Sequence, residues 1–464
     1  MLLPMPATSS MFLLAEAREH PMHVGGMQLF RPPEGMTALD VRALFDAAMS
    51  DAASRRDGVA PLLRKRPRRS VTTLGQWGWE IDEDFDLEHH VRRSALPAPG
   101  RVRDLLALVS RLHSTLLDRH RPLWEMHLIE GLEDGRFATY TKIHHALVDG
   151  VSSLRLLARM LSDDPGRRDM PPPWAMPLRR RAGGQGAANV GEAMREVLAL
   201  VAATPAALPA VARMVNRARH EQAAALSFVA PRTMFNVPIT GARRFAAQSW
   251  PTARLRRVSR AAGTTLNDVV LAMSAGALRR YLLAMDALPD APLIAMVPVS
   301  LHGTGSASAD GGGNLVGTIM CSLGTQLADP GARLAAISAS MTDGKQAMQG
   351  LTQVQALAAS ALGISPLALS YLPLVHDVLR PPFNIVISNV PGPHRPMYWN
   401  GARLDGLFPL SIPLDGQALN ITCTTYYDAI GFGIVGCRRS VPRLQRLLTD
   451  LDEELAALEL AVAG

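Results

Sequence analysis

Apolar and polar residues follow two different periods along the chain, which predict helices and strands in both halves. Apolar residues recur every three to four positions over residues 102–117, 264–283 and 443–460, as in amphipathic helices. Short apolar runs between Gly, Pro and Asp predict strands. In order these are WGWEIDEDFDLEHHV, LWEMHLIEGL, FATYTKIHHALVDG, the QSW that leads into a helix, PLIAMVPVSL, NLVGTIMCSL, PFNIVISNV, ITCTTYYD and AIGFGIVGC. The pattern predicts a mixed α/β protein.

The length of the chain favours two domains. A chain of 464 residues exceeds the ~250 to 300 residues at which single cores stop growing. We assign residues 1–162 to an N-terminal domain, 163–235 to a linker and helical connection, and 236–464 to a C-terminal domain. Prolines, glycines and charges dominate residues 163–189, which predicts a linker. Its RRR cluster at 179–181 is either a solvated part of that linker or a contact for lipid or phosphate.

The segment KIHHALVDG lies where a predicted strand turns into a helix over residues 151–161. A positioned histidine acts as a general base near neutral pH and contributes about 10² to 10⁴ in rate. Adjacent side chains of an extended segment point to opposite faces, so one of His144 and His145 would work and the other would support it. Asp149 would pair with an arginine and fix the turn, or contact the base. These residues alone support a catalytic turn and a purely structural turn equally.

Other patterns argue against a metal site and against covalent catalysis. Neighbouring histidines on a strand do not converge on one ion, and the sequence has no HExxH or CxxC pattern. No GxSxG elbow lies near the histidines to supply a nucleophile. The pair His89 and His90 lacks a following Asp-Gly, so we interpret it as structural. His127, inside a predicted strand, is interpreted as a core residue.

Composition and charge narrow the classes of protein. The net charge of +7 predicts a surface that attracts anions, but aromatic residues make up only 5% and the arginines are scattered, which argues against a nucleic-acid partner. Three cysteines without a CxxC pattern fit a reducing compartment such as the cytoplasm. The N-terminus lacks the basic start of a signal peptide. Prolines interrupt the apolar run 197–212, so we expect no transmembrane span.

HHALVDG fits the HHxxxDG pattern of the coenzyme A-dependent acyltransferase superfamily, and further motifs narrow the resemblance. PMHVGGMQLF stands near the start, followed in order by PLWEMHLIEGL, HHALVDG, NDVVLA, VPVSL, GGGN and FNIVISNVPGP. In this order the whole chain resembles the bacterial wax ester synthase/acyl-CoA:diacylglycerol acyltransferases.

The resemblance implies a fold, a reaction and a set of site residues. The fold would be two chloramphenicol acetyltransferase-like α/β domains, each with a mixed sheet and helices, meeting at an active-site tunnel. His145 would be the base, His144 would shape the turn and Asp149 would hold it, while Gly150 leaves room for the backbone. A long-chain acyl group would pass from acyl-CoA to a fatty alcohol or a diacylglycerol without a covalent intermediate. Acyl-CoA would be a co-substrate, and no cofactor is implied.

The remaining motifs have two interpretations each. Asn267 is either a polar group of the tunnel, touching substrate or holding His145, or a helix cap, and Asp268 would support that helix end. Thr264 or Thr265 could also cap the helix. Ser388 and Asn389 belong to a turn and are candidate tunnel groups. The residues of PLW are core, or a wall of the acyl pocket.

Competing functions stay open at this point. Relatives in the superfamily use amino or small-alcohol acceptors, but no carrier domain is attached here. A pure binding module would leave the complete HHxxxDG motif idle. Because acceptor and product are both apolar, we expect peripheral contact with the inner face of a membrane or with lipid inclusions, through a basic face and an apolar patch such as residues 197–212.

Overall fold

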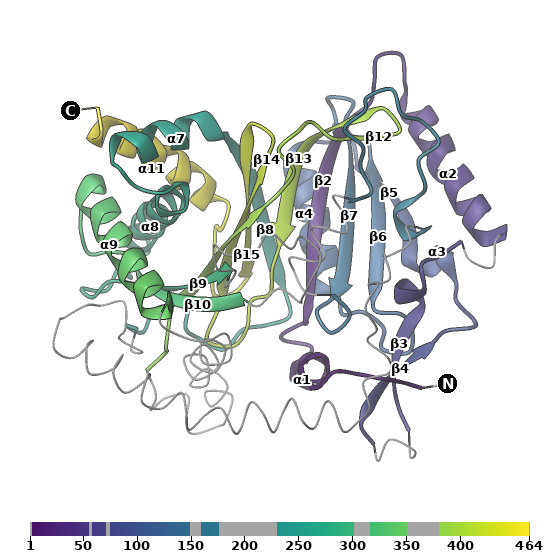
Figure 1. The fold of residues 1–464 in the computed structure, drawn as a ribbon, viewed down its shortest axis with the longest axis horizontal. Coiled ribbons are helices and arrows are strands. Elements are labelled where there is room, and N and C mark those ends of the chain that lie inside the picture. The colour runs from purple at the N-terminus through teal and green to yellow at the C-terminus, as the bar shows by residue number, and fades with distance from the viewer. Residues whose placement is uncertain are drawn as a thin grey trace.

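The computed structural model describes residues 2–54, 58–70, 75–148, 159–175, 230–300, 316–349 and 380–463. Two six-stranded sheets stand side by side, and a three-stranded sheet lies at one edge (Figure 1). Helices α7, α8, α9 and α11 cover the outer side of one large sheet, while α2 and α3 flank the other (Figure 1). The mixed α/β class predicted from the sequence is confirmed.

The first sheet carries the strand that leads into the histidine pair. Its order is β12-β13-β2-β7-β6-β5, and β7 runs antiparallel to both neighbours. The strands are β2 (His23–Arg31), β5 (Val91–Ala95), β6 (Trp124–Glu130), β7 (Phe137–His144), β12 (Tyr398–Trp399) and β13 (Ala402–Leu410). The predicted strands in LWEMHLIEGL and FATYTKIHH are confirmed, and β7 ends at the first histidine.

The second sheet is mixed, because β11 runs parallel to β9 and β14 while the other pairs are antiparallel. Its order is β10-β9-β11-β14-β15-β8. The strands are β8 (Arg243–Pro251), β9 (Ile294–Ser300), β10 (Val316–Ser322), β11 (Ile385–Pro391), β14 (Leu419–Tyr426) and β15 (Ala429–Cys437). All six were predicted from the apolar runs, and their inner side chains form one large core with α7, α8, α9 and α11.

The helices begin and end where local signals place them. The predicted helices are α4 (Val102–Ser114), α7 (Thr252–Ala261), α8 (Leu266–Ala284) and α11 (Arg446–Ala461). At the start of α8, the Asp268 carboxylate accepts from the backbone N of Thr265 at 2.9 Å, and the Thr265 hydroxyl accepts from the backbone N of Asp268 at 3.2 Å. This reciprocal capping box satisfies backbone donors that a helix start leaves unpaired. The support predicted for Asp268 is confirmed.

Several elements were not predicted. Among them are the strands β2, β12 and β13 of the first sheet and the helices α1 (Ala7–Ala15), α2 (Ala38–Ser54), α9 (Pro330–Gln349) and η1 (Pro61–Arg64). The strands β1 (Leu3–Pro4) and β3 (Lys65–Arg69), which form the small sheet with β4 (Trp77–Ile81), were not predicted either. The strand predicted over WGWEIDEDFDLEHHV is confirmed for WGWEI, which is β4, and wrong beyond it, because the helical turn α3 (Leu87–His90) follows and then β5. Asp86 caps α3 by accepting from the backbone N of Glu88, which ends the extended run.

The first sheet takes two strands from late in the chain. Its β13 pairs with β2 from Arg403 opposite Arg31 to Leu410 opposite Gly25. In the other direction, the hydroxyls of Ser110 and Ser114 on α4 accept from backbone N–H groups of β8. The two halves are therefore interlocked. The domain boundaries assigned at residues 162 and 235 therefore stay a prediction.

Part of the predicted linker is packed. Trp174, in the short helix η3 (Pro173–Ala175), is 1% exposed, and its ring meets Phe45 edge to face at a centroid distance of 5.7 Å. Burial of a large aromatic side chain in the core of the first sheet overrides the polar composition around it. Residues 163–169 are exposed, whereas Trp174 packs into the core, so the linker stays a prediction and does not describe the surroundings of Trp174. The RRR cluster, the apolar run 197–212, GGGN and most of the predicted helix 151–161 lie outside the described residues.

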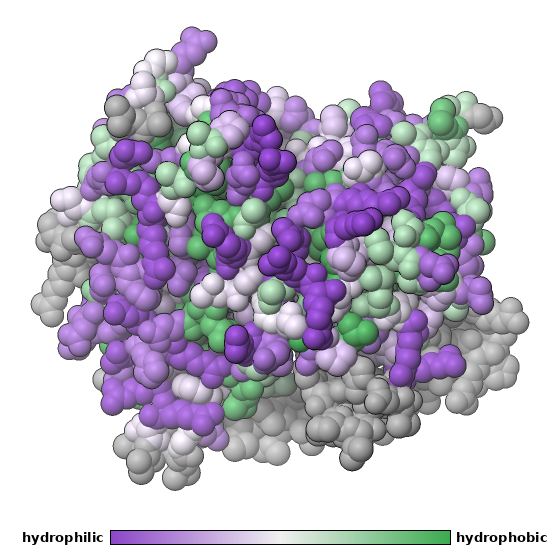
Figure 2. All heavy atoms as spheres, turned by 180° about the vertical axis from the view of Figure 1, so that it is seen from behind, coloured by the Kyte–Doolittle hydropathy of each residue, from purple (hydrophilic) through white to green (hydrophobic). Residues whose placement is uncertain are grey.

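Surface properties differ between regions of the molecule. The coloured residues on the face opposite Figure 1 are mainly hydrophilic, and the apolar ones form small separate areas (Figure 2). Within the described residues, no helix combines the length and apolar character needed to span a bilayer.

Candidate active site

Two neighbouring segments hold the histidine turn at the end of β7. The backbone N–H of His144 donates to the carbonyl of Leu123 at 2.9 Å, and that of His145 donates to the carbonyl of Met22 at 2.8 Å. A further bond from the N–H of Leu147 to the carbonyl of His144, at 2.9 Å, closes the turn. PLW and the start of β2 thus fix the backbone on which both imidazoles stand.

His144 is fully buried, and both of its ring nitrogens have a neighbour. Its Nδ1 accepts from the backbone N–H of Ala146 at 3.0 Å, and its Nε2 lies 3.3 Å from Oε1 of Glu16. Since Nδ1 accepts, the ring hydrogen resides on Nε2, the nitrogen near the carboxylate, although this contact does not meet hydrogen-bond geometry. Both sides of this ring are therefore held by protein groups next to the turn.

Glu16 joins the site from the segment after α1, and the sequence analysis missed it. Its carboxylate accepts from Nε of Arg119 at 3.0 Å and from the backbone N–H of Met22 at 3.1 Å. Burial would raise the pKa of Glu16, but His144, Met22 and Arg119 together hold that pKa below its usual value. No spacing signal links Glu16 to a motif so distant in the chain; only the fold brings them together.

His145 has a different environment. Its half-buried ring stacks on Phe12 of α1 with a centroid distance of 4.2 Å and an angle of 24° between the planes. The flat contact fixes the ring orientation by packing. His144 is thus fully buried and His145 only partly buried, while the roles expected for the two rings stay predictions. Asp149 and Gly150 lie outside the described residues.

The structure brings together two of the polar residues predicted in the second half. The amide nitrogen of Asn389 on β11 donates to Oδ1 of Asn267 on α8 at 3.4 Å. The helix-cap interpretation of Asn267 is wrong, because Thr265 is the cap. With its oxygen accepting from Asn389, Asn267 can present its NH₂ group as a donor. Ser388, one residue before Asn389, lies opposite Thr422 in the parallel pair β11–β14.

A buried polar chain connects the two sheets near these residues. The Thr422 hydroxyl donates to Ser411 Oγ at 2.9 Å, the carbonyl of Ser411 lies 3.4 Å from Nε2 of His113, and the carbonyl of His113 lies 2.9 Å from Nε2 of His23. His23 stands opposite His144 in the β2–β7 pair. Burial lowers the pKa of His113 to about 3 and that of His23 well below its usual value, so both rings are neutral near pH 7.

Buried charged side chains of β6 and β7, near the histidine turn, pair with one another. The ammonium of Lys142 donates to the carbonyls of Leu112 and Thr115 and lies 3.2 Å from Glu125. Burial would raise the pKa of Glu125, but His127 and Lys142 lower it to about 2. His127 is buried beside this carboxylate, as its interpretation as a core residue requires.

The PLW and second histidine motifs are built into the core. Leu123 and Trp124 are buried, and the indole N–H of Trp124 donates to the carbonyl of Leu63. His90 places Nδ1 2.8 Å from the carbonyl of Trp124 and stacks on the same indole. These contacts support the structural interpretation of both motifs.

A cavity of about 1500 Å³ opens in the N-terminal half near α2, α3 and β5. Apolar side chains of Phe45, Met49 and Phe85 line it together with Arg92 and Arg93. None of the predicted site residues lines this cavity, so its volume does not identify the active site.

Comparisons with known proteins agree with these motifs. Residues 5–270 match the wax ester synthase/diacylglycerol acyltransferase catalytic domain, and residues 312–459 match the C-terminal domain of the same family. A Mycobacterium tuberculosis protein named "Probable diacyglycerol O-acyltransferase" is 51% identical over 461 residues, which cover 99% of each chain.

Solved structures extend the comparison. The wax ester synthase/diacylglycerol acyltransferase from Marinobacter aquaeolei is 43% identical with a TM-score of 0.78, and all of each chain is covered. The first condensation domain of the calcium-dependent antibiotic synthetase has a TM-score of 0.58 at 16% identity, with all of this chain and 96% of the other covered. This second likeness concerns the fold alone, and it agrees with the acyltransferase-like architecture predicted from the sequence.

Proposed function

The chain belongs to the wax ester synthase/diacylglycerol acyltransferase family and is an acyl-CoA-dependent O-acyltransferase, and we propose that His145 is its general base. The acyl group would pass directly from the thioester to the hydroxyl of a fatty alcohol or a diacylglycerol. The transfer would use no cofactor, with acyl-CoA as the co-substrate.

The observation that supports this proposal is the unequal placement of the two histidines. Both nitrogens of His144 face protein groups inside the core, whereas the ring of His145 is half-buried on the turn. A general base must come within hydrogen-bond reach of a substrate proton. Of the two, His145 is the ring that a substrate can approach.

Each step of the proposed acyl transfer is assigned to a residue. His145 takes the proton as the acceptor oxygen attacks the thioester carbonyl, and a tetrahedral oxyanion forms. Collapse of the intermediate breaks the carbon–sulfur bond, and the departing thiolate takes the proton from His145. Donors aimed at the oxyanion are worth about 10² to 10³ in rate each; the NH₂ group of Asn267, held by Asn389, is our candidate. Ser388 and Gly150 would line the substrate path, and Asp149 would hold the turn.

The cysteines support a direct transfer. Burial raises the pKa of Cys321 to about 12 and that of Cys423 well above its usual value, so neither forms a thiolate near pH 7. Burial would also raise the pKa of Cys437, but hydrogen bonds from Thr240 and Ser440 lower it to about 7. Its side chain is nevertheless fully buried, so an acyl carrier does not reach the sulfur.

The substrates suggest where the enzyme works. A long-chain alcohol or diacylglycerol partitions into lipid, so we propose peripheral association with the cytoplasmic face of a membrane or with lipid inclusions. The positive net charge supports attraction to anionic headgroups.

Acyl transfer from palmitoyl-CoA to hexadecanol or to a diacylglycerol tests the proposal through release of free thiol. We expect His145→Ala to lose about 10² to 10⁴ in kcat. Retention of most activity would remove His145 from the mechanism.

With palmitoyl-CoA and no acceptor, the intact mass of the protein should stay unchanged; a stable increase by one acyl group would instead establish an acyl-enzyme. The ratio of the two acceptor rates gives the preferred product.

A further inference from the structure

Helix α1 has one face on the histidine turn and another exposed to solvent. Phe12 stacks on His145, and Leu13 is buried in an apolar cluster with Leu117, Leu123 and Ala146. Met11 and Leu14, three positions apart and thus on one side of the helix, are 66% and 65% exposed. Leu116, beside Leu117, is also exposed. The helix thus carries an outward apolar surface that the fold of the described residues does not use.

A basic hairpin lies next to this surface. Strands β3 and β4 together contain four basic side chains, Lys65, Arg66, Arg68 and Arg69, and one carboxylate, Glu80. Trp79 of β4 packs in the same cluster as Leu13, so the hairpin and α1 are neighbours at the lower edge of the molecule (Figure 1). The guanidinium of Arg69 lies over the ring of Trp77, 4.4 Å from its centroid. A cation held over an aromatic ring is a pair that suits the boundary between headgroups and acyl chains.

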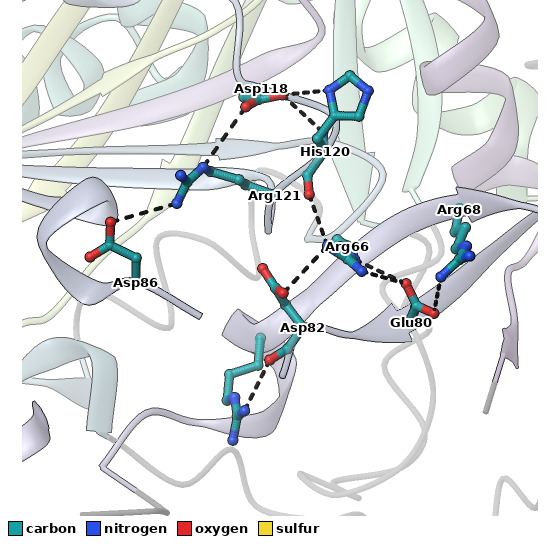
Figure 3. Close-up of polar contacts among 9 residues, drawn as sticks. Arg66, Arg68, Glu80, Asp82, Asp86, Asp118, His120 and Arg121 are labelled. Carbon is teal, nitrogen blue, oxygen red and sulfur yellow. Dashed lines mark hydrogen bonds and ion pairs between the residues drawn. The ribbon is translucent and has the colours of Figure 1, made fainter. Parts of the chain in front are cut away.

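A hydrogen bond from Arg66 of β3 joins the hairpin to the loop before β6 (Figure 3). Arg66 lies 2.9 Å from Glu80 and 3.4 Å from Asp82, and it also donates to the carbonyl of His120. Arg121 pairs with Asp86 and Asp118. Each exposed pair contributes little by itself; the Arg66 hydrogen bond and the packing of Trp79 join the hairpin to the chain around PLW. The basic surface therefore has a fixed position relative to the histidine turn.

We infer that α1 and the β3–β4 hairpin form the surface by which this protein docks onto an anionic lipid surface. Met11 and Leu14 would insert among the acyl chains, with Arg69 facing lipid phosphates and Arg68 exchanging its ion pair with Glu80 for such a phosphate. An apolar helix face with neighbouring arginines is the combination that binds the plane of a bilayer. This inference rests on the proposed function, which supplies the reason for lipid contact, and it assigns the contact to a surface different from residues 197–212.

The position of α1 gives the docking a consequence for the reaction. Phe12, which lies between Met11 and Leu14 in the sequence, stacks on His145. Glu16, just beyond the helix, lies beside His144. A docked α1 places the lipid phase one helix thickness from the base. An acceptor leaving that phase would reach the turn without passing through bulk water.

Co-sedimentation with vesicles tests the assignment on the full chain. The wild type is mixed with vesicles of equal parts phosphatidylglycerol and phosphatidylcholine, and with pure phosphatidylcholine. We expect the double variant Met11→Ser/Leu14→Ser to lose about tenfold or more in vesicle affinity, since several buried methylene groups contribute to binding. The matched control is Leu283→Ser/Leu460→Ser, which removes two exposed apolar side chains from α8 and α11. Arg68→Gln/Arg69→Gln should weaken binding to the anionic vesicles and reduce its dependence on salt.

The outcomes separate the docking surface from the catalytic proposal. Unchanged unfolding midpoints show that the variants fold. Loss of vesicle binding in the α1 variant but not in the control supports the assignment. Equal binding by wild type and the α1 variant overturns it, as does equal loss in the control. Acyl transfer by the wild type in detergent-dispersed substrate is scored separately, so a protein that transfers acyl groups but docks elsewhere refutes only the surface.

Discussion

Glu16 and His144 form a buried carboxylate–imidazole pair, with Oε1 and Nε2 3.3 Å apart. We expect Glu16 to be a positioning residue that holds the ring of His144, which in turn shapes the backbone that carries His145. Glu16→Gln keeps the size of the side chain and removes its charge. We expect kcat to fall about tenfold to a hundredfold, because a small misplacement of a catalytic group costs that much.

Steady-state kinetics with the variant separates this role from a general loss of folded protein. The KM for acyl-CoA should change little while kcat falls, and Glu16→Asp should recover part of the loss. If kcat stays at the wild-type value, the carboxylate has no influence on the base.

The stacking of Phe12 on His145 gives a second prediction. Aromatic pairs contribute about 0.5 to 1.5 kcal/mol beyond their burial, which corresponds to a rate effect of roughly twofold to tenfold if the contact orients the base. We expect Phe12→Leu to lower kcat within this range. Phe30→Leu, which removes a stacked ring from Phe137, is the control and should affect stability without a matching fall in kcat.

Asn267 and Asn389 give a third prediction, based on their hydrogen bond at 3.4 Å. Asn267→Ala should lower kcat about 10² to 10³-fold if its amide donates to the oxyanion. Asn389→Ala should cost less, and the double variant should cost less than the sum because the residues act as a pair.

The cap of the same helix supplies a matched comparison for Asn267. Thr265→Ala should lower the free energy of unfolding by about 1 kcal/mol and leave kcat nearly unchanged. Equal effects of Asn267→Ala and Thr265→Ala on kcat would mean that Asn267 acts only through the stability of the helix start.

A fourth prediction concerns the pH dependence of stability. Burial lowers the pKa of His90 from 6.5 to about 4. Between these values the unfolded chain binds a proton at this site and the folded protein does not, so stability falls as the pH drops from about 6.5 to about 4. His90 contributes about 1.4 kcal/mol per pH unit to that slope.

Denaturant titrations across this pH range check the sign. His90→Gln, whose amide can still donate to the carbonyl of Trp124, should show a shallower slope. Phe85→Leu removes a ring stacked on His90 but keeps the titrating group, so its slope should match that of the wild type. An unchanged slope in His90→Gln would show that His90 is protonated in the folded protein.

Features set by neighbouring residues were predicted from the sequence. The start of α8 depends on Thr265 and Asp268, three positions apart, and β7 is marked by its own apolar run up to His144. Such signals are local, so spacing and residue type suffice to find them. The family motifs placed the histidine pair and the Asn267 region for the same reason.

Features that depend on distant parts of the chain were missed. Glu16 acquires its role only when β7 brings His144 beside the N-terminal segment. Trp174 is buried although its neighbours are polar, because one aromatic side chain finds space beside Phe45. The short α1 shows no clear amphipathic pattern, because apolar residues lie both on its buried face and on its solvent-exposed face. In each case tertiary contact outweighs the local signal.

The insertion of β13 beside β2 has a consequence for dissecting the enzyme. A fragment that ends before residue 402 would leave the edge of β2 uncovered, with a row of unpaired backbone groups ready to join another chain. The strand that ends at His144 therefore belongs to a sheet that late-synthesised residues complete. A nascent chain completes this sheet only after residues 402–410 of its 464 have been made. We expect the two pieces of a gene split between the motifs to need each other to remain in solution.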